Sequence, residues 1–117
     1  MGNSYYGESS VLPGWMAENR DWAERMYNDR RFISRMGARW RELRAAGLRG
    51  KVMRMISANY RLLRGPARAH FRRWPVLNRR VWPNPVARGS YRAEVRFLRS
   101  WISRRMNWID GRFMRRR

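Results

Sequence analysis

Cysteine is absent from this chain of 117 residues, and histidine and lysine each occur once. Without cysteine the chain has no disulfide framework, no thiolate nucleophile and no cysteine ligand for a metal. The single histidine, His70, has no neighbouring carboxylate in a ligand pattern. The sequence therefore disfavours a metal site, and His70 is expected to be a partly exposed helix residue.

Long apolar runs and phosphate-binding glycine motifs are also missing. No run of 18 or more apolar residues is present, so no segment is expected to span a bilayer. The first residues lack the basic start and apolar core of a signal peptide. Gly47 and Gly50 follow no strand and form no GxGxxG or Walker pattern. The sequence thus predicts no nucleotide-binding loop and no export or membrane signal in these residues.

Acidic residues are few: 28 Lys+Arg face 8 Asp+Glu, giving a net charge of +20. Residues 1–28 hold two arginines and four acidic residues, a net −2, so the remainder carries +22. Such a field attracts polyanions or acidic partners. The arginine pairs look dispersed around the helices, so a solvated basic surface and a polyanion-binding surface both remain open. The pairs are Arg30-Arg31, Arg72-Arg73, Arg79-Arg80 and Arg104-Arg105.

The four acidic residues after residue 28 are widely separated along the chain. They are Asp29, Glu42, Glu94 and Asp110. This spacing does not support a catalytic carboxylate pair. Each is instead expected to cap a helix or to pair with an arginine.

Apolar residues recur at helical spacing, which predicts an all-α fold, a small bundle of about four helices. We expect a loop over 1–14, a helical domain over 15–110 and a basic tail over 111–117. The first helix would carry Trp15, Trp22 and Met26 on one side. The second would start at Asn28 or Asp29 and end at Gly47, with an apolar stripe of Phe32, Met36, Trp40 and Leu43.

The third helical segment is interrupted by Gly65-Pro66, although apolar residues continue in one stripe across it. Proline removes a backbone donor and clashes with the preceding turn. We expect either a kinked helix from about Arg49 to Trp74 or two helices that meet at Pro66.

Residues 75–89 form a proline-rich loop before the last helix. Val76, Leu77, Val81 and Trp82 are expected to hold this loop against the core. Ser90 is expected to cap the last helix, which Asp110-Gly111 would close. The apolar stripe of this helix consists of Tyr91, Val95, Leu98, Ile102 and Ile109, widened by Phe97, Trp101 and Trp108.

The tryptophans could stack on bases or sugars, but most fall on these apolar stripes. Trp40, Trp74, Trp101 and Trp108 are therefore expected in the core. Trp15, Trp22 and Trp82 are the candidates for a surface that docks on a partner.

Several motifs follow one another in an order that resembles a known family. They are Gly2-Asn3 with Tyr5-Tyr6-Gly7; Asp29, Phe32, Arg39, Trp40, Leu43 and Arg44; Phe71, Arg73, Trp74 and Pro75; Trp82, Pro83 and Asn84; and Tyr91, Glu94, Trp101, Arg105, Trp108 and Asp110. This series is similar to the C-terminal part of the CotH kinase family, the spore-coat-type atypical protein kinases of bacteria. Departures from the family pattern are Ala69-His70, Asn78 and Pro66.

The resemblance implies that the motif residues are structural. In the family, the nucleotide-binding lobe, the catalytic aspartate and the magnesium-binding aspartates lie upstream of the glycine-asparagine pair. We therefore expect no catalytic, cofactor-binding or metal-binding residue here and no kinase activity of this chain alone. ATP and magnesium would belong to the full-length family, and its setting suggests a spore coat or export.

Three origins of such a fragment are open: a truncated or mis-started reading frame, which we favour, half of a split protein, or a retained remnant. Two other function classes also stay open. The chain could be an arginine-rich helical module that binds nucleic acid or another polyanion. It could also dock on a partner such as the missing kinase lobe or an acidic protein.

Overall fold

The computed structural model describes residues 21–82, 84 and 86–114, and the side chains from residue 25 onward. Five helices and no strand occur in these ranges, which confirms the all-α prediction. The helices are α1 (Asp21–Asn28), α2 (Arg30–Ala45), α3 (Leu48–Leu62), α4 (Arg64–Arg73) and α5 (Tyr91–Phe113). The predictions for the 1–14 loop, Trp15, the side chain of Trp22 and Pro83 lie outside the described residues.

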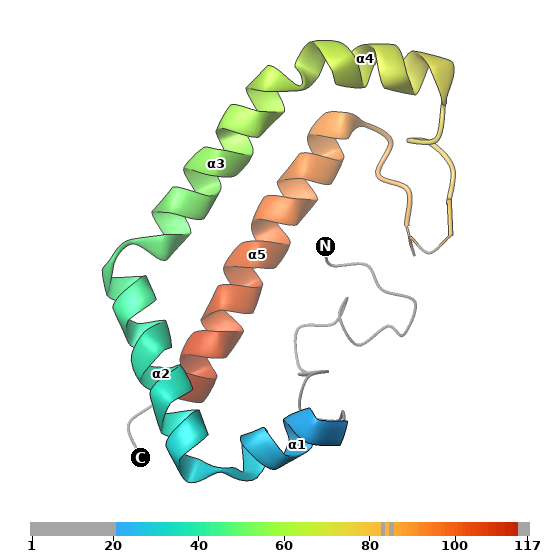
Figure 1. Cartoon of the computed structure of the whole chain (residues 1–117). Coiled ribbons are helices and arrows are strands. Elements are labelled where there is room, and N and C mark those ends of the chain that lie inside the picture. The colour runs from blue at the N-terminus through green and yellow to red at the C-terminus, as the bar shows by residue number, and fades with distance from the viewer. Residues whose placement is uncertain (1–20, 83, 85, 115–117) are drawn as a thin grey trace.

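The helices form an open arch rather than a closed bundle (Figure 1). α2 and α3 rise along one side, α4 turns across the far end, and α5 returns alongside α3 in the opposite direction. The C-terminal half of α5 reaches α2, and α1 packs on the start of α2. The arch measures 51 × 31 × 21 Å. α5 therefore contacts both α2 and α3.

Both ends of α2 lie where they were predicted from the sequence. The Asp29 carboxylate accepts a hydrogen bond from the Arg31 backbone N–H at 2.7 Å and so caps the helix. Gly47 follows the last turn with φ 75°, a left-handed conformation that glycine adopts without steric cost. Both predicted boundaries are confirmed.

The third segment forms two helices, which is one of the two expected arrangements. The helices meet at Leu63 rather than at Pro66. Pro66 has no N–H to donate to the carbonyl four residues earlier, which belongs to Leu62. Leu62 is the last residue of α3. Pro66 itself sits in the first turn of α4, where a missing N–H is tolerated.

The last helix begins as expected and ends later. The Ser90 hydroxyl accepts a hydrogen bond from the Ala93 backbone N–H at 3.1 Å. The predicted end at Asp110-Gly111 is wrong, because α5 continues to Phe113. The Met114 N–H still bonds the Asp110 carbonyl at 2.7 Å, so Gly111 stays within helical hydrogen bonding.

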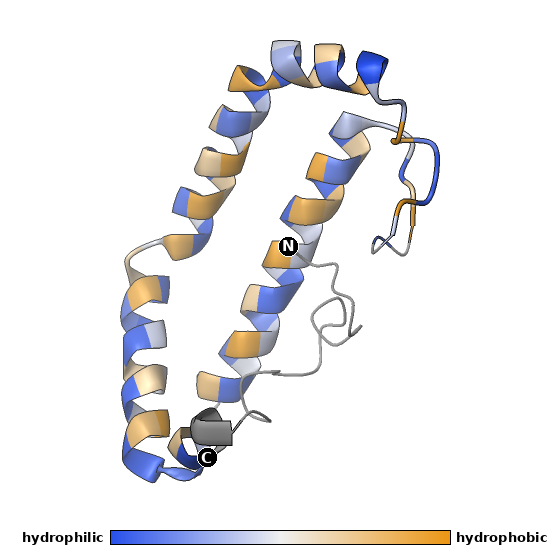
Figure 2. Cartoon of the chain, turned by 45° about the vertical axis from the view of Figure 1, so that its right-hand side comes forward, coloured by the Kyte–Doolittle hydropathy of each residue, from blue (hydrophilic) through white to orange (hydrophobic). Residues whose placement is uncertain are grey.

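Burial is shallow along the whole arch. Met106, at 7% exposure, is the only buried hydrophobic side chain among the described residues. Most apolar residues on the facing sides of α2, α3 and α5 are half-buried, including Trp40, Trp101 and Trp108. Figure 2 shows hydrophobic and hydrophilic residues alternating along these helices.

Trp74 and the loop after α4 do not pack as expected. Trp74 is 54% exposed, so its assignment to the core is wrong. Its extended backbone, φ −125° and ψ 87°, ends α4 and turns the ring off the helical stripe. In the loop, Val76 and Leu77 are half-buried, whereas Val81 and Trp82 are 40% and 71% exposed. Of the four apolar side chains expected to hold the loop against the core, Val76 and Leu77 are therefore the more buried.

Gly37 is buried where α2 meets the end of α5. A Cβ at this position would lie 3.3 Å from Arg41 Nη1 and 3.4 Å from Phe113 Cδ1. The Arg41 guanidinium in turn donates to the Phe113 carbonyl at 3.1 Å. The missing side chain thus allows the two helices to approach each other.

Gly37→Leu should destabilise the chain, because the side chain must displace Phe113 and Arg41. Overpacking costs about 1–3 kcal/mol, and leucine regains about 1 kcal/mol of helix propensity. Gly111→Leu is the matched control, since a Cβ there has no atom within 4 Å. Thermal unfolding followed by circular dichroism should show a lower midpoint for Gly37→Leu than for Gly111→Leu. Equal midpoints would contradict a close α2–α5 approach at Gly37.

Candidate functional site

Asp110 near the end of α5 accepts three hydrogen bonds from two residues of α2. The Trp40 indole N–H donates to Oδ1 at 2.8 Å, and Arg44 donates from Nε to Oδ1 at 2.9 Å and from Nη2 to Oδ2 at 2.6 Å. The Arg44 and Asp110 side chains are 19% and 22% exposed. We call Trp40, Arg44 and Asp110 the polar cluster.

Local sequence explains why these groups meet. Trp40 and Arg44 are four residues apart on α2, so both project from one face of the helix. The Arg44 guanidinium also lies 5.9 Å from the Trp40 ring centroid. Arg44 bonds both oxygens of Asp110 in a two-point contact, and Oδ1 also accepts from the Trp40 indole. The carboxylate therefore holds two helices together and is not poised to take a proton from a substrate.

A second charged contact holds the other end of α5. Arg88 in the loop donates to Glu94 Oε2 at 3.1 Å, and its guanidinium lies 3.4 Å from the Phe97 ring centroid. The Arg88 side chain is only 16% exposed. Sequence reasoning missed Arg88, although an arginine six residues before Glu94 was a usable signal.

Three aromatic rings join α3, α4 and the start of α5. The ring centroids of Tyr60 and Tyr91 are 5.3 Å apart, and those of Phe71 and Tyr91 are 6.0 Å apart. All three rings are half-buried. Phe71 and Tyr91, two motif residues far apart in the sequence, are thus brought together as packing residues.

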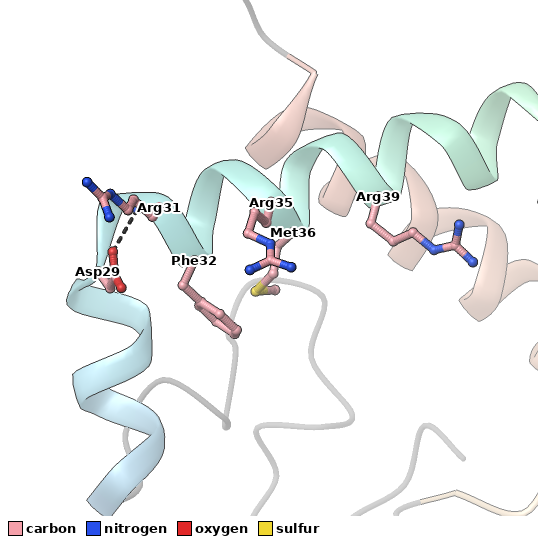
Figure 3. Close-up of a pocket in the computed structure, with 6 residues that line it drawn as sticks. All are labelled: Asp29, Arg31, Phe32, Arg35, Met36 and Arg39. Carbon is pink, nitrogen blue, oxygen red and sulfur yellow. Dashed lines mark hydrogen bonds between the residues drawn. The ribbon is translucent and has the colours of Figure 1, made fainter.

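The first half of α2 borders a groove of about 680 Å³ (Figure 3). Phe32 and Met36 project from one side of the helix, and the lining is completed by Asp29, Arg31, Arg35 and Arg39. Asp29, the acidic residue of the groove, is engaged in capping α2. The groove therefore offers apolar surface and arginines rather than a free carboxylate.

The remaining motif residues support α2 and α5 locally. Arg39 bonds Glu42 at 3.0 Å, but these side chains are 69% and 65% exposed, so the pair contributes little. Leu43 and Trp101 are half-buried. The Arg105 guanidinium lies 4.3 Å from the Trp108 ring centroid, and burial lowers the pKa of Arg105 below its ordinary value. It remains charged at neutral pH, because arginine titrates far above it.

The motif residues near the end of α4 and in the following loop stay apart from the polar cluster. Arg73 lies over the Trp74 ring at 5.1 Å, and Pro75 follows at the surface. The Asn84 backbone N–H bonds the Val81 carbonyl at 2.8 Å, which forms a turn around Trp82. His70 is exposed, as expected, with its ring 5.0 Å from Phe71.

The described residues do not fit a magnesium–nucleotide site. No group of three His, Cys, Asp or Glu residues among them could hold a metal ion. Asp29, Glu42, Glu94 and Asp110 are all engaged as a cap or as arginine partners, which confirms the expectation from sequence. Of the described helices, none has the length and apolar character needed to cross a membrane.

Comparison with protein families gives one match. The family model described as CotH kinase protein matches residues 5–109. This range covers most of the chain and includes the motif residues from Asp29 to Trp108, and Asp110 follows directly after it. The resemblance seen in the sequence is confirmed. Comparisons with curated proteins and with solved structures gave no match.

Asp110→Ala should destabilise the fold strongly, because Arg44 and the Trp40 N–H would lose their shared acceptor in a mostly buried place. We expect a loss of about 2–4 kcal/mol of unfolding free energy. Glu42→Ala removes the partner of the exposed pair and should cost at most about 0.5 kcal/mol. Urea unfolding of both variants checks this, and a double-mutant cycle with Arg44→Ala isolates the pair. Similar losses for the two variants would refute the role of the polar cluster.

Proposed function

Because the chain belongs to the CotH kinase protein family, we propose that it is the C-terminal helical part of a CotH-like protein kinase and has a structural or accessory role rather than a catalytic one by itself. The observation that carries this proposal is the polar cluster. Its three motif residues satisfy one another's hydrogen bonds between α2 and α5. Because these three motif residues bind one another, they support the fold, and none of the three is left free for phosphate transfer.

An accessory role requires a surface for a partner, and exposed apolar side chains support this part of the proposal. Apolar side chains at the α3–α4 break and in the loop are exposed: Leu62 at 75%, Leu63 at 45% and Trp82 at 71%. Exposed apolar groups of this size are typical of contact surfaces. The proposed partner is a nucleotide-binding kinase lobe, which would also hold the ATP and magnesium of the family. A spore-coat or exported setting is part of the same proposal.

A second function, binding of a polyanion, is supported by charge placement. In the described part of the chain after residue 28, every acidic side chain is engaged elsewhere. Many exposed arginines of α3, α4 and α5 have no acidic partner there, for example Arg54, Arg61 and Arg68. Unneutralised arginines are the usual electrostatic footprint of a phosphate-binding surface.

The purified chain incubated with ATP and magnesium should transfer no phosphate to itself or to an added protein. The reason is that the carboxylates of the described residues are occupied as caps and arginine partners. Incorporation of labelled γ-phosphate checks this, with a CotH-family kinase that includes its nucleotide-binding lobe as the positive control. Incorporation above the protein-free blank, dependent on magnesium, would overturn the accessory role.

A further inference from the structure

On α3, Arg54 and Arg61 are seven residues apart and share a helical face, and on α4, Arg64 and Arg68 are four residues apart and do the same. On α5, Arg92 and Arg99 are seven residues apart and share a face in the same way. We call these six arginines the basic seam.

Two hollows each bring an arginine of α5 beside arginines of α3 or α4. One hollow, of about 450 Å³, is lined by Arg54, Arg61 and Arg99. The other, of about 250 Å³, is lined by Arg64, Arg68 and Arg92. Packing α5 against α3 thus brings together arginines that are far apart in sequence, and none of them belongs to the four arginine pairs considered in the sequence analysis.

Among the described residues, no carboxylate neutralises the basic seam. Neither hollow has an acidic residue in its described lining, and none of the six arginines takes part in an ion pair within the described chain. Arg99 donates to the Ser57 hydroxyl, which leaves its charge uncompensated. Like charges that line the same hollow repel one another, and a bound anion would relieve that repulsion.

Aromatic rings lie in the second hollow, beside the arginines. Tyr60, Phe71 and Tyr91 line it, and each ring is half-buried, with part of its surface open to solvent. A flat anionic membrane surface or an acidic peptide would need the charges but not the rings. Arginines beside partly accessible aromatic rings match a ligand with both phosphates and planar bases.

We propose that the basic seam binds single-stranded nucleic acid, with backbone phosphates along the arginines and a base against the ring of Phe71. This inference rests on the second proposed function, polyanion binding, and assigns its residues and ligand class. It is independent of the accessory role in a kinase.

The test measures binding of a labelled single-stranded oligonucleotide of about 12 nucleotides at several salt concentrations. In the seam variant Arg61→Gln/Arg68→Gln/Arg92→Gln, affinity should fall about tenfold or more. The slope of log K against log salt should fall by about 2, since each phosphate contact on a single strand contributes about 0.7. Circular dichroism of each variant should show unchanged helicity.

The matched control is Arg30→Gln/Arg31→Gln/Arg104→Gln. These three arginines are exposed and line neither hollow, and their substitution removes the same charge as the seam variant does. Binding by this variant should change less than about twofold, with an unchanged salt slope. Equal losses in the two variants would leave polyanion binding intact and overturn the seam. Absence of salt-sensitive binding by the unmodified chain would overturn both polyanion binding and its assignment to the basic seam.

Base recognition is tested separately at Phe71. Phe71→Leu should weaken oligonucleotide binding about fivefold or more. Phe71→Trp should bind as the unmodified chain does, because the indole keeps a stacking face. Polyphosphate of matched charge should bind more weakly than the oligonucleotide and should be insensitive to both substitutions. Equal binding of polyphosphate and oligonucleotide would overturn the single-strand assignment, even if the seam variant loses affinity.

Discussion

The charge-assisted contact between Asp110 and α2 is the interaction on which the arch depends. Only one hydrophobic side chain of the described residues is buried, so apolar burial cannot by itself fix how α2 and α5 lie. A carboxylate that receives three directed hydrogen bonds fixes both the distance and the rotation of the two helices. Gly37 and Phe113 then pack closely beside it.

The start of α5 is held by the same chemistry. Asp110 meets an arginine and an indole from α2, and Glu94 meets Arg88, which stacks on Phe97 of α5 itself. In both places an acidic residue of α5, a mostly buried arginine from another segment and an aromatic ring form one contact. α5 is thus anchored near both ends, and the half-buried apolar stripe fills the length between the anchors.

Sequence reasoning succeeded where a local rule decides structure. Asp29, Gly47 and Ser90 mark helix ends through backbone groups within a few residues, so their roles could be predicted. The four acidic residues were also assigned correctly as caps or arginine partners, because nothing else nearby suited them. The Pro66 interruption was foreseen, but the break at Leu63 follows from the carbonyl that proline leaves unbonded.

Failures came where the answer depends on contacts between distant segments. Helical spacing placed Trp74 on an apolar stripe, yet the chain leaves the helix at that residue and exposes the ring. Arg88 and the basic seam were missed for a related reason. Their significance appears only when the loop and α5 return alongside α3 and bring residues some forty positions apart together, as for Arg99 and Ser57.

Stability and charge are coupled in this arch. The few acidic residues after residue 28 are used at the caps and anchors, so within the described chain exposed arginines such as Arg54, Arg61 and Arg68 form no ion pair. Self-repulsion among these arginines opposes a fold that has little buried apolar surface to offset it. A polyanion that binds only the folded arrangement would shift the equilibrium towards folding by mass action. The same would hold for a kinase lobe that covers the exposed leucines and Trp82, so either partner would contribute the stabilisation that the arch lacks in its own interior.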